Sequence, residues 1–246
     1  MRMKALSLII PLSLCLPSHA GEKGIVPAGA KLEHLFTRSA AIKGGLTEGP
    51  AVAPDGSIFF SDIPMGKEGG AGMILRHDPR SGKTKVFKSD SGKSNGLMFD
   101  SAGRLLGCQG SGFGKRRVVA WDIKTGGETA VAGKFGGKRF NAPNDLVIDR
   151  KGRIYFSDPR YVGHETRELE HRAVYRVDTD GKVHEITRQV EKPNGLALSP
   201  EQGTLYVADH NNGTDRIDPT LSPPKQGSMK LYAFGLDDNQ SLVIET

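Results

Sequence analysis

Four segments of this chain repeat one pattern at nearly constant spacing. Each begins with an oxygen-bearing side chain, continues with a short apolar run and a turn, and ends in an alternating strand. The openers are Glu48, Asn95, Asn144 and Asn194, which are separated by 47, 49 and 50 residues. A repeat of this length is typical of propellers and solenoids, in which each repeat is one supersecondary unit.

Each repeat holds about four short strand candidates joined by turns rich in Gly and Asp. In the third repeat the candidates are segments 144–149, 153–158, 173–178 and 182–187. Gly and Asp suit tight reversals that need a positive φ. Four antiparallel strands in about 48 residues are typical of a propeller blade. We therefore predict an all-β fold, a β-propeller with about four blades, over residues 48–246.

The first 47 residues do not follow the repeat. Residues 1–20 combine Arg2 and Lys4 with an apolar run and a small-residue cleavage site at 18–20, which predicts a secretory signal peptide. Residues 21–47 form an N-terminal segment, with one short strand expected over Lys31–Phe36. We therefore expect an exported protein, periplasmic or extracellular, without a membrane anchor in its mature form.

The cysteine positions and the charge pattern indicate a buried thiol and argue against nucleic-acid binding. Cleavage of the signal peptide would remove Cys15 and leave Cys108, which lies in a strand-like run and is expected to be a buried thiol. The net charge of +6 comes from scattered basic residues, and the single run, Lys115–Arg117, is interpreted as a solvated loop. Nucleic-acid binding is therefore not expected. Segment 164–171, HETRELEH, is interpreted as a charged loop, with one helical turn as the alternative.

The openers are the candidate functional residues. The first strand of a propeller blade lines the central channel, so equivalent positions of successive blades converge on the axis. One carboxylate and three carboxamides offer hard oxygen ligands, which favour calcium, with magnesium second and zinc a further alternative. The competing interpretation is that each Asn only caps a turn, as Asn-Gly pairs often do.

At these residues the chain resembles the SMP-30/gluconolactonase family, six-bladed propellers that hold one divalent ion in the channel. The similarity is strongest in EGPAVAPDG, RFNAPNDLVIDRKGRIYFSDPRY and KPNGLALSPEQGTLYVADHNNGT, and it extends from Glu48 to Thr246. The resemblance implies hydrolysis of a sugar-acid lactone such as glucono-1,5-lactone. It also implies metal ligation by Glu48, Asn144 and Asn194.

The resemblance assigns further roles, and the chain departs from the family in two ways. Asp145 matches a substrate-contacting position. Because no residue matches the family's general base, Asp145 is also the candidate proton acceptor, with Asp209 and His210 as alternatives. Asn95 is expected to face the substrate or to lie next to the residues that bind the metal. Ala142 replaces a family Arg, which leaves Arg139 as the nearest basic candidate for substrate binding. The family's fourth ligand, a fifth-blade Asp, has no counterpart, and blades five and six are expected to be absent.

Two other functions compete with the lactonase. An incomplete propeller could be a non-catalytic module that binds a ligand or a partner, and its open sheet edges would favour self-association. Related calcium propellers hydrolyse organophosphates, so the bond that is cleaved could also differ. Rates on a lactone and on a phosphotriester would separate the two enzymatic alternatives.

Overall fold

The computed structural model describes residues 26–27, 29–39, 42, 44–64, 70–215, 225–237 and 242–243. The predicted signal peptide lies outside this part of the chain. Contacts divide the chain into two units, Met1–His34 and Leu35–Thr246, and all strands found among the described residues lie in the second. Among the described residues there is no helix that is long and apolar enough to span a membrane.

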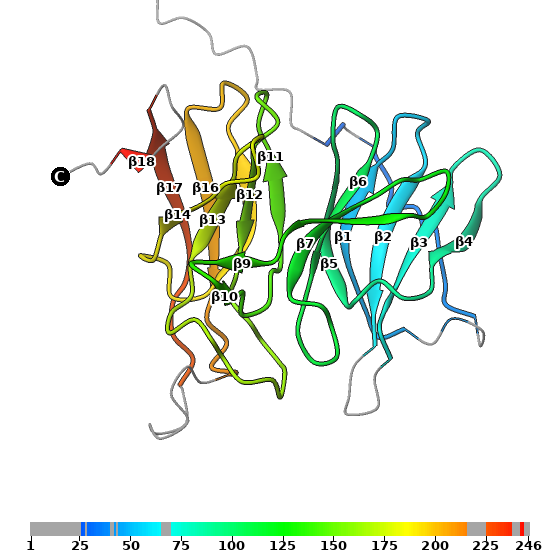
Figure 1. Cartoon of the computed structure of the whole chain (residues 1–246). Coiled ribbons are helices and arrows are strands. Elements are labelled where there is room, and N and C mark those ends of the chain that lie inside the picture. The colour runs from blue at the N-terminus through cyan, green and yellow to red at the C-terminus, as the bar shows by residue number, and fades with distance from the viewer. Residues whose placement is uncertain are drawn as a thin grey trace, which may run out of the picture. The chain divides into compact units, whose positions relative to one another are not determined.

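The second unit contains four antiparallel sheets of four strands, each built from consecutive strands (Figure 1). The first sheet comprises β1 (Leu46–Val52), β2 (Ile58–Ile63), β3 (Met73–Asp78) and β4 (Lys83–Lys88). The second comprises β5 (Ser94–Phe99), β6 (Leu105–Gln109), β7 (Arg117–Trp121) and β8 (Glu128–Ala132). The third comprises β11 (Leu146–Ile148), β12 (Ile154–Ser157), β13 (Val174–Val177) and β14 (Val183–Thr187). The fourth comprises β15 (Pro193–Leu198), β16 (Thr204–His210), β17 (Met229–Leu236) and β18 (Leu242–Val243).

The predicted propeller blades are confirmed, and two local expectations are not. A small hairpin, β9 (Lys134–Phe135) and β10 (Lys138–Arg139), was not predicted. The strand expected over Lys31–Phe36 is wrong, because residues 30–39 have no strand and the Leu32 side chain is exposed. Segment 164–171 is a loop, as predicted.

Both faces of the middle blades are buried, which explains their continuous apolar strands. In β6, Leu105 packs with Phe59 of blade one, whereas the next residue, Leu106, packs with Phe156 of blade three. Tyr155 then faces the fourth blade, in a cluster with Leu205. Successive side chains of a strand point to opposite faces, so a blade between two others buries both. The core is therefore a series of layers between blades.

A buried aspartate at the end of the second strand holds the start of three blades. Asp62, Asp158 and Asp209 are each less than 5% exposed. Their carboxylates accept hydrogen bonds from backbone N–H groups of Gly45 (Asp62), Asn141 and Ala142 (Asp158), and Glu191 and Lys192 (Asp209). These donors lie just before the openers. The three aspartates therefore share one structural role at the start of their blades.

Long connections gather at the end of the blades where the openers lie. The turns at the opposite end are short, as in segments 100–104 and 149–153. At the opener end, segment 110–116 joins β6 to β7, and segment 158–173 joins β12 to β13. Figure 1 shows these two loops projecting on the same side of the blades. Long loops on a rigid scaffold commonly carry function.

Candidate functional site

The four openers line a single cavity of about 840 Å³. Glu48, Asn95, Asn144 and Asn194 come from four different blades, so the structure brings them together although they are far apart in the sequence. The other lining residues are Leu46, Ile63, Pro64, Lys93, Gly110, Ser111, Gly112, Phe113, Ala142, Pro143, Tyr161, Val162, Gly163, His164, His210, Asn212 and Thr214.

Glycines after the openers allow neighbouring blades to approach closely. A Cβ atom at Gly49 would lie 2.2 Å from the backbone oxygen of Asn95, and one at Gly96 would lie 2.3 Å from Asp145 Oδ1. Only Gly49 of these two has a positive φ, 53°. Gly96 is therefore required by the neighbouring blade rather than by a turn, which argues against the turn-cap interpretation of this Asn-Gly pair.

Hydrogen bonds link the three Asn openers to neighbouring blades. Ser61 Oγ donates to the backbone oxygen of Asn95 at 2.8 Å, and Ser157 Oγ donates to that of Asn194 at 2.6 Å. Between blades two and three, the N–H of Gly96 donates to the Asn144 oxygen at 2.7 Å. The openers therefore sit on a continuous polar network that fixes their spacing.

Glu48 lies in an environment that disfavours its negative charge. Its pKa is raised, first because the carboxyl is partly buried and then because the Asp145 carboxylate lies nearby. Burial also raises the pKa of Asp145, although backbone N–H groups of Leu196 and Leu146 oppose the shift. Two adjacent carboxylates of this kind would be stabilised by a cation.

Tyr161 determines how the Asn194 amide is oriented. Asn194 Nδ2 donates to the Tyr161 hydroxyl at 2.8 Å, and that hydroxyl donates to the His210 backbone oxygen at 3.2 Å. Because the amide nitrogen is committed to Tyr161, the Asn194 carbonyl oxygen is the group left for the cavity. Burial raises the pKa of Tyr161 to about 12, so its hydroxyl stays protonated at neutral pH.

The Tyr161 ring is itself held by a buried lysine. Lys192 Nζ lies 4.4 Å from the ring centroid and donates to Asn212 Oδ1 at 3.0 Å and to the Thr214 backbone oxygen at 2.5 Å. Burial, together with Arg172 and Arg167, lowers the pKa of Lys192 to about 7. This lysine therefore joins the start of blade four to the loop that follows β16.

Two predicted site residues do not line the cavity. Asp145 lies behind the wall, where its Oδ2 accepts the N–H of Leu196 at 2.9 Å. The Arg139 side chain is exposed and donates to the Lys115 backbone oxygen at 3.0 Å. The structure therefore brings neither residue to the cavity surface beside Glu48.

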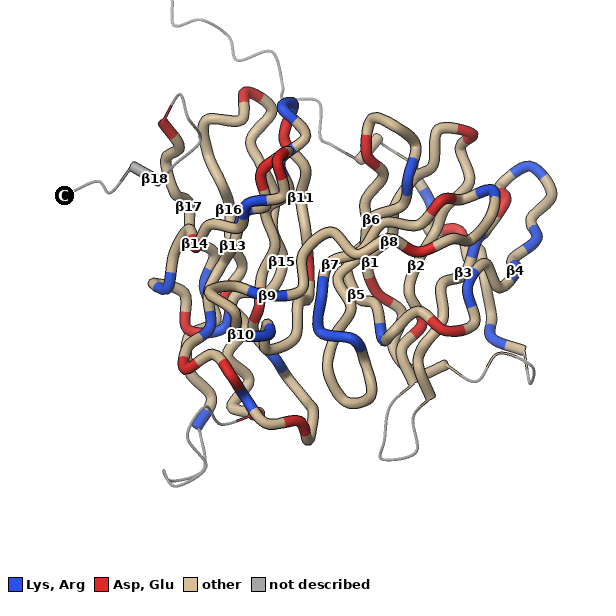
Figure 2. Tube along the Cα trace, viewed as in Figure 1, with Lys and Arg blue, Asp and Glu red and all other residues tan. Residues whose placement is uncertain are grey.

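The basic run Lys115–Arg117 was wrongly interpreted as a solvated loop. Arg116 is 2% exposed, and its Nε donates to the Phe140 backbone oxygen at 2.7 Å. Arg117 and Lys115 both pair with Glu128. These partners come from the next strand and the next blade, and the local sequence does not reveal them. Elsewhere both charge signs are interspersed along the chain (Figure 2).

Sequence reasoning missed several lining residues. Lys93 is 8% exposed and brings a cationic side chain to the cavity wall. Its φ of 53° is unusual for a residue with a side chain. Tyr161 directly follows the SDPR sequence. The only signal that could have pointed to it was the need of the Asn194 amide for a hydrogen-bond partner.

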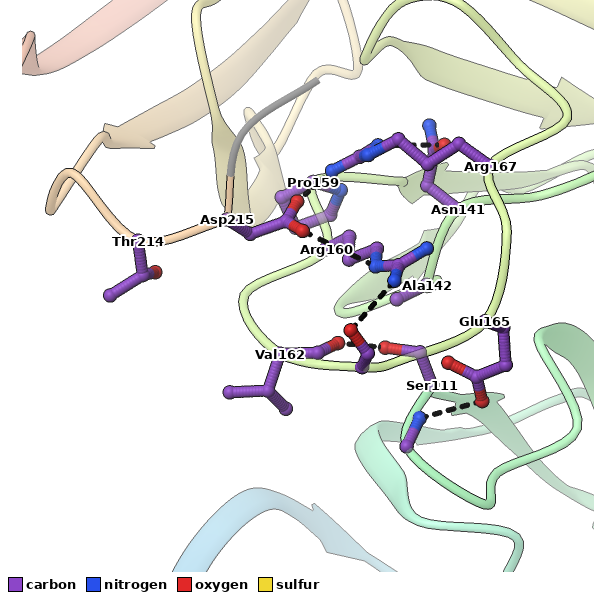
Figure 3. Close-up of polar contacts among 12 residues, drawn as sticks. Ser111, Asn141, Ala142, Pro159, Arg160, Val162, Glu165, Arg167, Thr214 and Asp215 are labelled. Carbon is purple, nitrogen blue, oxygen red and sulfur yellow. Dashed lines mark hydrogen bonds and ion pairs between the residues drawn. The ribbon is translucent and has the colours of Figure 1, made fainter. Parts of the chain in front are cut away.

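An ionic cluster behind the wall anchors loop 158–173 to blade four (Figure 3). Asp215 pairs with Arg160 at 3.4 Å, with Arg172 at 3.7 Å, and with Arg167. Burial lowers the pKa of Arg167 to about 10. Arg167 also donates to Asn141 Oδ1 at 2.8 Å, just before the third opener.

The donors in the cavity wall fit a hard cation. No cluster of three or more His, Cys, Asp or Glu side chains suited to a metal occurs among the described residues. Glu48, Asn144 and Asn194 instead offer one carboxylate and two amide oxygens, and Tyr161 orients one amide. Such a set suits an ion that accepts neutral oxygen ligands.

A family model described as the SMP-30/Gluconolactonase/LRE-like region matches residues 46–217. The chain belongs to this family. It is 29% identical over 212 residues to a gluconolactonase from Zymomonas mobilis, and the match covers 78% of this chain and 53% of that protein. It is also 28% identical to a lactonohydrolase from Aspergillus oryzae, over 72% of this chain and 43% of that protein. The chain thus spans about half the length of these curated relatives.

Solved structures confirm the propeller fold. A gluconolactonase from Xanthomonas campestris is 28% identical with a TM-score of 0.66, over 81% of this chain and 61% of that one. Regucalcin from Agrobacterium tumefaciens, a calcium-binding protein, is 19% identical with a TM-score of 0.50, over 66% of this chain and 52% of its own. The predicted family and fold class are therefore correct.

Proposed function

We propose that this chain is a lactonase that opens sugar-acid lactones, with glucono-1,5-lactone as the reference substrate, using a divalent cation in the cavity. The observation that carries the proposal is the meeting of four blade openers in one cavity of a family member whose relatives include gluconolactonases. The signal-like residues 1–20 support action outside the cytoplasm.

Glu48, Asn144 and Asn194 would hold the cation. Calcium is the first choice, because the donors are all oxygen and two are neutral amides; magnesium and zinc are the alternatives. When bound, the ion supplies polarisation of the lactone carbonyl and stabilises its developing negative charge. Asn95, on the same wall, would bind the substrate rather than the ion.

The chain's own residues would perform the proton and charge transfers. Water adds to the lactone carbonyl, the tetrahedral oxyanion collapses, and the ring oxygen leaves as an alcohol, giving a hydroxy acid. Lys93, which lines the cavity, would donate a hydrogen bond to the oxyanion. His210 lines the cavity and would take the proton from water and return it to the leaving oxygen. Asp145, whose carboxylate accepts the Leu196 N–H, would instead influence catalysis through its effect on the Glu48 carboxylate.

Lactone hydrolysis by the purified chain, with calcium and after EDTA treatment, tests the proposal. Glu48→Gln is expected to lower kcat/KM at least about 100-fold, since the loss of even an outer partner of a ligand costs 10- to 100-fold. Glu170→Gln, a change at an exposed carboxylate, is the matched control and should leave the rate unchanged. Calcium binding without turnover on lactone or phosphotriester would instead indicate a binding module.

His210→Gln and Asp145→Asn separate the two proton acceptors. If His210 accepts the proton, His210→Gln lowers kcat with little change in calcium affinity. If Asp145 is the base, Asp145→Asn has the larger effect on kcat at equal calcium saturation. Equal and small effects of both variants would reject both assignments.

A further inference from the structure

Two loops from neighbouring blades meet beside the cavity. Ser111 Oγ donates to the Val162 backbone oxygen, and Glu165 Oε1 accepts the N–H groups of Gly112 at 2.8 Å and Phe113 at 3.2 Å. Figure 3 shows the Ser111–Val162 contact and the Glu165 carboxylate reaching across to the segment that follows Ser111. The loops 110–116 and 158–173 are thus bonded to each other.

Glycine makes this close approach feasible. A Cβ atom at Gly163, whose φ is 136°, would lie 2.8 Å from Ser111 Cβ and 2.7 Å from Glu165 Oε2. Real Cβ atoms do not approach other heavy atoms so closely, so a larger residue would push the loops apart. The contact between the two loops therefore depends on the glycine at position 163.

The junction holds Phe113 in an unfavourable conformation. Its φ is 76°, in a region that bulky residues rarely adopt, and it persists because Glu165 accepts the N–H groups of both peptides that flank Gly112. The Phe113 side chain is nonetheless 63% exposed and packs only partly, with its ring 4.5 Å from that of His164. Core packing therefore does not explain why an aromatic ring is kept there.

Apolar side chains surround the polar part of the cavity. Phe113 and Val162 are 63% and 58% exposed on one side, and Leu46 is 43% exposed on the blade-one side, next to Ile63 and Pro64. All five line the same cavity as the openers. Exposed apolar surface next to a polar centre favours a ligand that has a polar head and an apolar substituent.

We propose that Phe113, with Val162 and His164, binds an aliphatic or aromatic substituent of the substrate, so that lactones with an apolar group outside the ring are preferred over bare polyol lactones. This proposal rests on the proposed function, because the lactone ring is placed at the openers. Phe113 is then the specificity-determining residue of the site, and its backbone strain is maintained by the bonds from Glu165.

The kinetic test compares glucono-1,5-lactone with δ-decalactone, which carries a pentyl chain. In Phe113→Ser the KM for δ-decalactone is expected to rise at least about tenfold, and by a larger factor than the KM for glucono-1,5-lactone. Phe113→Gly is the second variant, since glycine accepts the positive φ and keeps the loop while removing the ring. Val86→Ser, a change at an exposed apolar residue on β4, is the control.

A binding test separates this proposal from the proposed function. The non-hydrolysable lactams 6-pentylpiperidin-2-one and piperidin-2-one are titrated calorimetrically into wild type and Phe113→Gly. Tighter binding of the pentyl lactam by wild type, lost in Phe113→Gly, supports the apolar site even if no lactone is hydrolysed. Equal binding of both lactams by wild type, or an unchanged preference in Phe113→Gly, overturns it whatever the rates are.

Discussion

Single residues set the chemistry of the cavity, and Tyr161 illustrates how. Its hydroxyl fixes the Asn194 amide, which directs the carbonyl oxygen toward the cavity. Tyr161→Phe removes that anchor, so we expect calcium affinity to fall about tenfold or more, as for other partners that orient metal ligands. Calorimetric titration of calcium measures this. Tyr206→Phe, a change at an exposed tyrosine on β16, should have wild-type affinity, and an unchanged Kd in Tyr161→Phe would contradict the assignment.

The buried Asp158 predicts a specific pH dependence of stability. Burial raises its pKa from 3.8 to about 6, so between these values the folded chain keeps a proton that the unfolded chain has released. The contribution of Asp158 to the free energy of unfolding should therefore fall as pH rises from about 4 to about 6, by about 3 kcal/mol in total, and then stay constant.

Urea unfolding of wild type and Asp158→Asn at several pH values measures this contribution, because the difference between the two cancels most other titrations. Asp122→Asn provides a control of opposite sign. Backbone N–H groups of Thr125 and Lys124 lower the pKa of that exposed aspartate, so its stabilising contribution is lost as pH falls. Parallel curves for wild type and Asp158→Asn would contradict the prediction.

The sequence predicted which residues line the cavity better than it predicted their hydrogen-bond partners. The equal spacing of the openers identified Glu48, Asn144 and Asn194 as cavity residues, since propeller symmetry converts spacing into position. It could not show that Asp145 turns to the Leu196 backbone, nor that Arg116 is buried on main-chain oxygens. Both outcomes depend on atoms supplied by other blades, and no local pattern encodes them.

At the scale of elements, the strands were predictable where both faces are buried. Apolar runs such as those of β6 and β12 follow directly from packing between two blades. The hairpin β9–β10 was missed because each strand has two residues around Gly136-Gly137, too few for a periodic pattern. The Lys31–Phe36 strand was wrong: the apolar residues of KLEHLF do not alternate, and Leu32 and Leu35 are exposed rather than packed against a sheet.

A serine bond between blades gives a prediction at the same scale. Ser157 Oγ donates to the Asn194 backbone oxygen, and Ser157 itself is fully buried. Ser157→Ala leaves that carbonyl without its hydroxyl donor, so we expect a loss of about 1–3 kcal/mol in the free energy of unfolding. Denaturant titration measures it. Ser81→Ala, which removes an exposed turn hydroxyl that donates to Asp78, should cost much less, and equal losses would refute the argument.

At the scale of the whole molecule, the fourth blade differs from the second and third in the part of the chain that the structure describes. One face of β16 and β17 packs into the core through Leu205 and Val207. The opposite face presents Tyr206, Met229 and Leu231, which are 37%, 47% and 70% exposed. In blades two and three, the equivalent faces are covered by the next blade. The fourth blade thus carries an apolar face of the kind that elsewhere in the molecule packs against another sheet.

This apolar face predicts concentration-dependent self-association of the chain. Covering Leu231 and Met229 removes apolar surface from water, whereas a charge placed there would have to be buried without a partner. Leu231→Lys is therefore expected to shift the chain toward monomer in sedimentation equilibrium at about 100 μM, a concentration at which exposed apolar surface drives association. Val86→Lys changes an exposed valine on β4, away from this face, and should leave the distribution unchanged. If wild type is monomeric at that concentration, or if both variants dissociate equally, the face of β16 and β17 is not what holds the copies together.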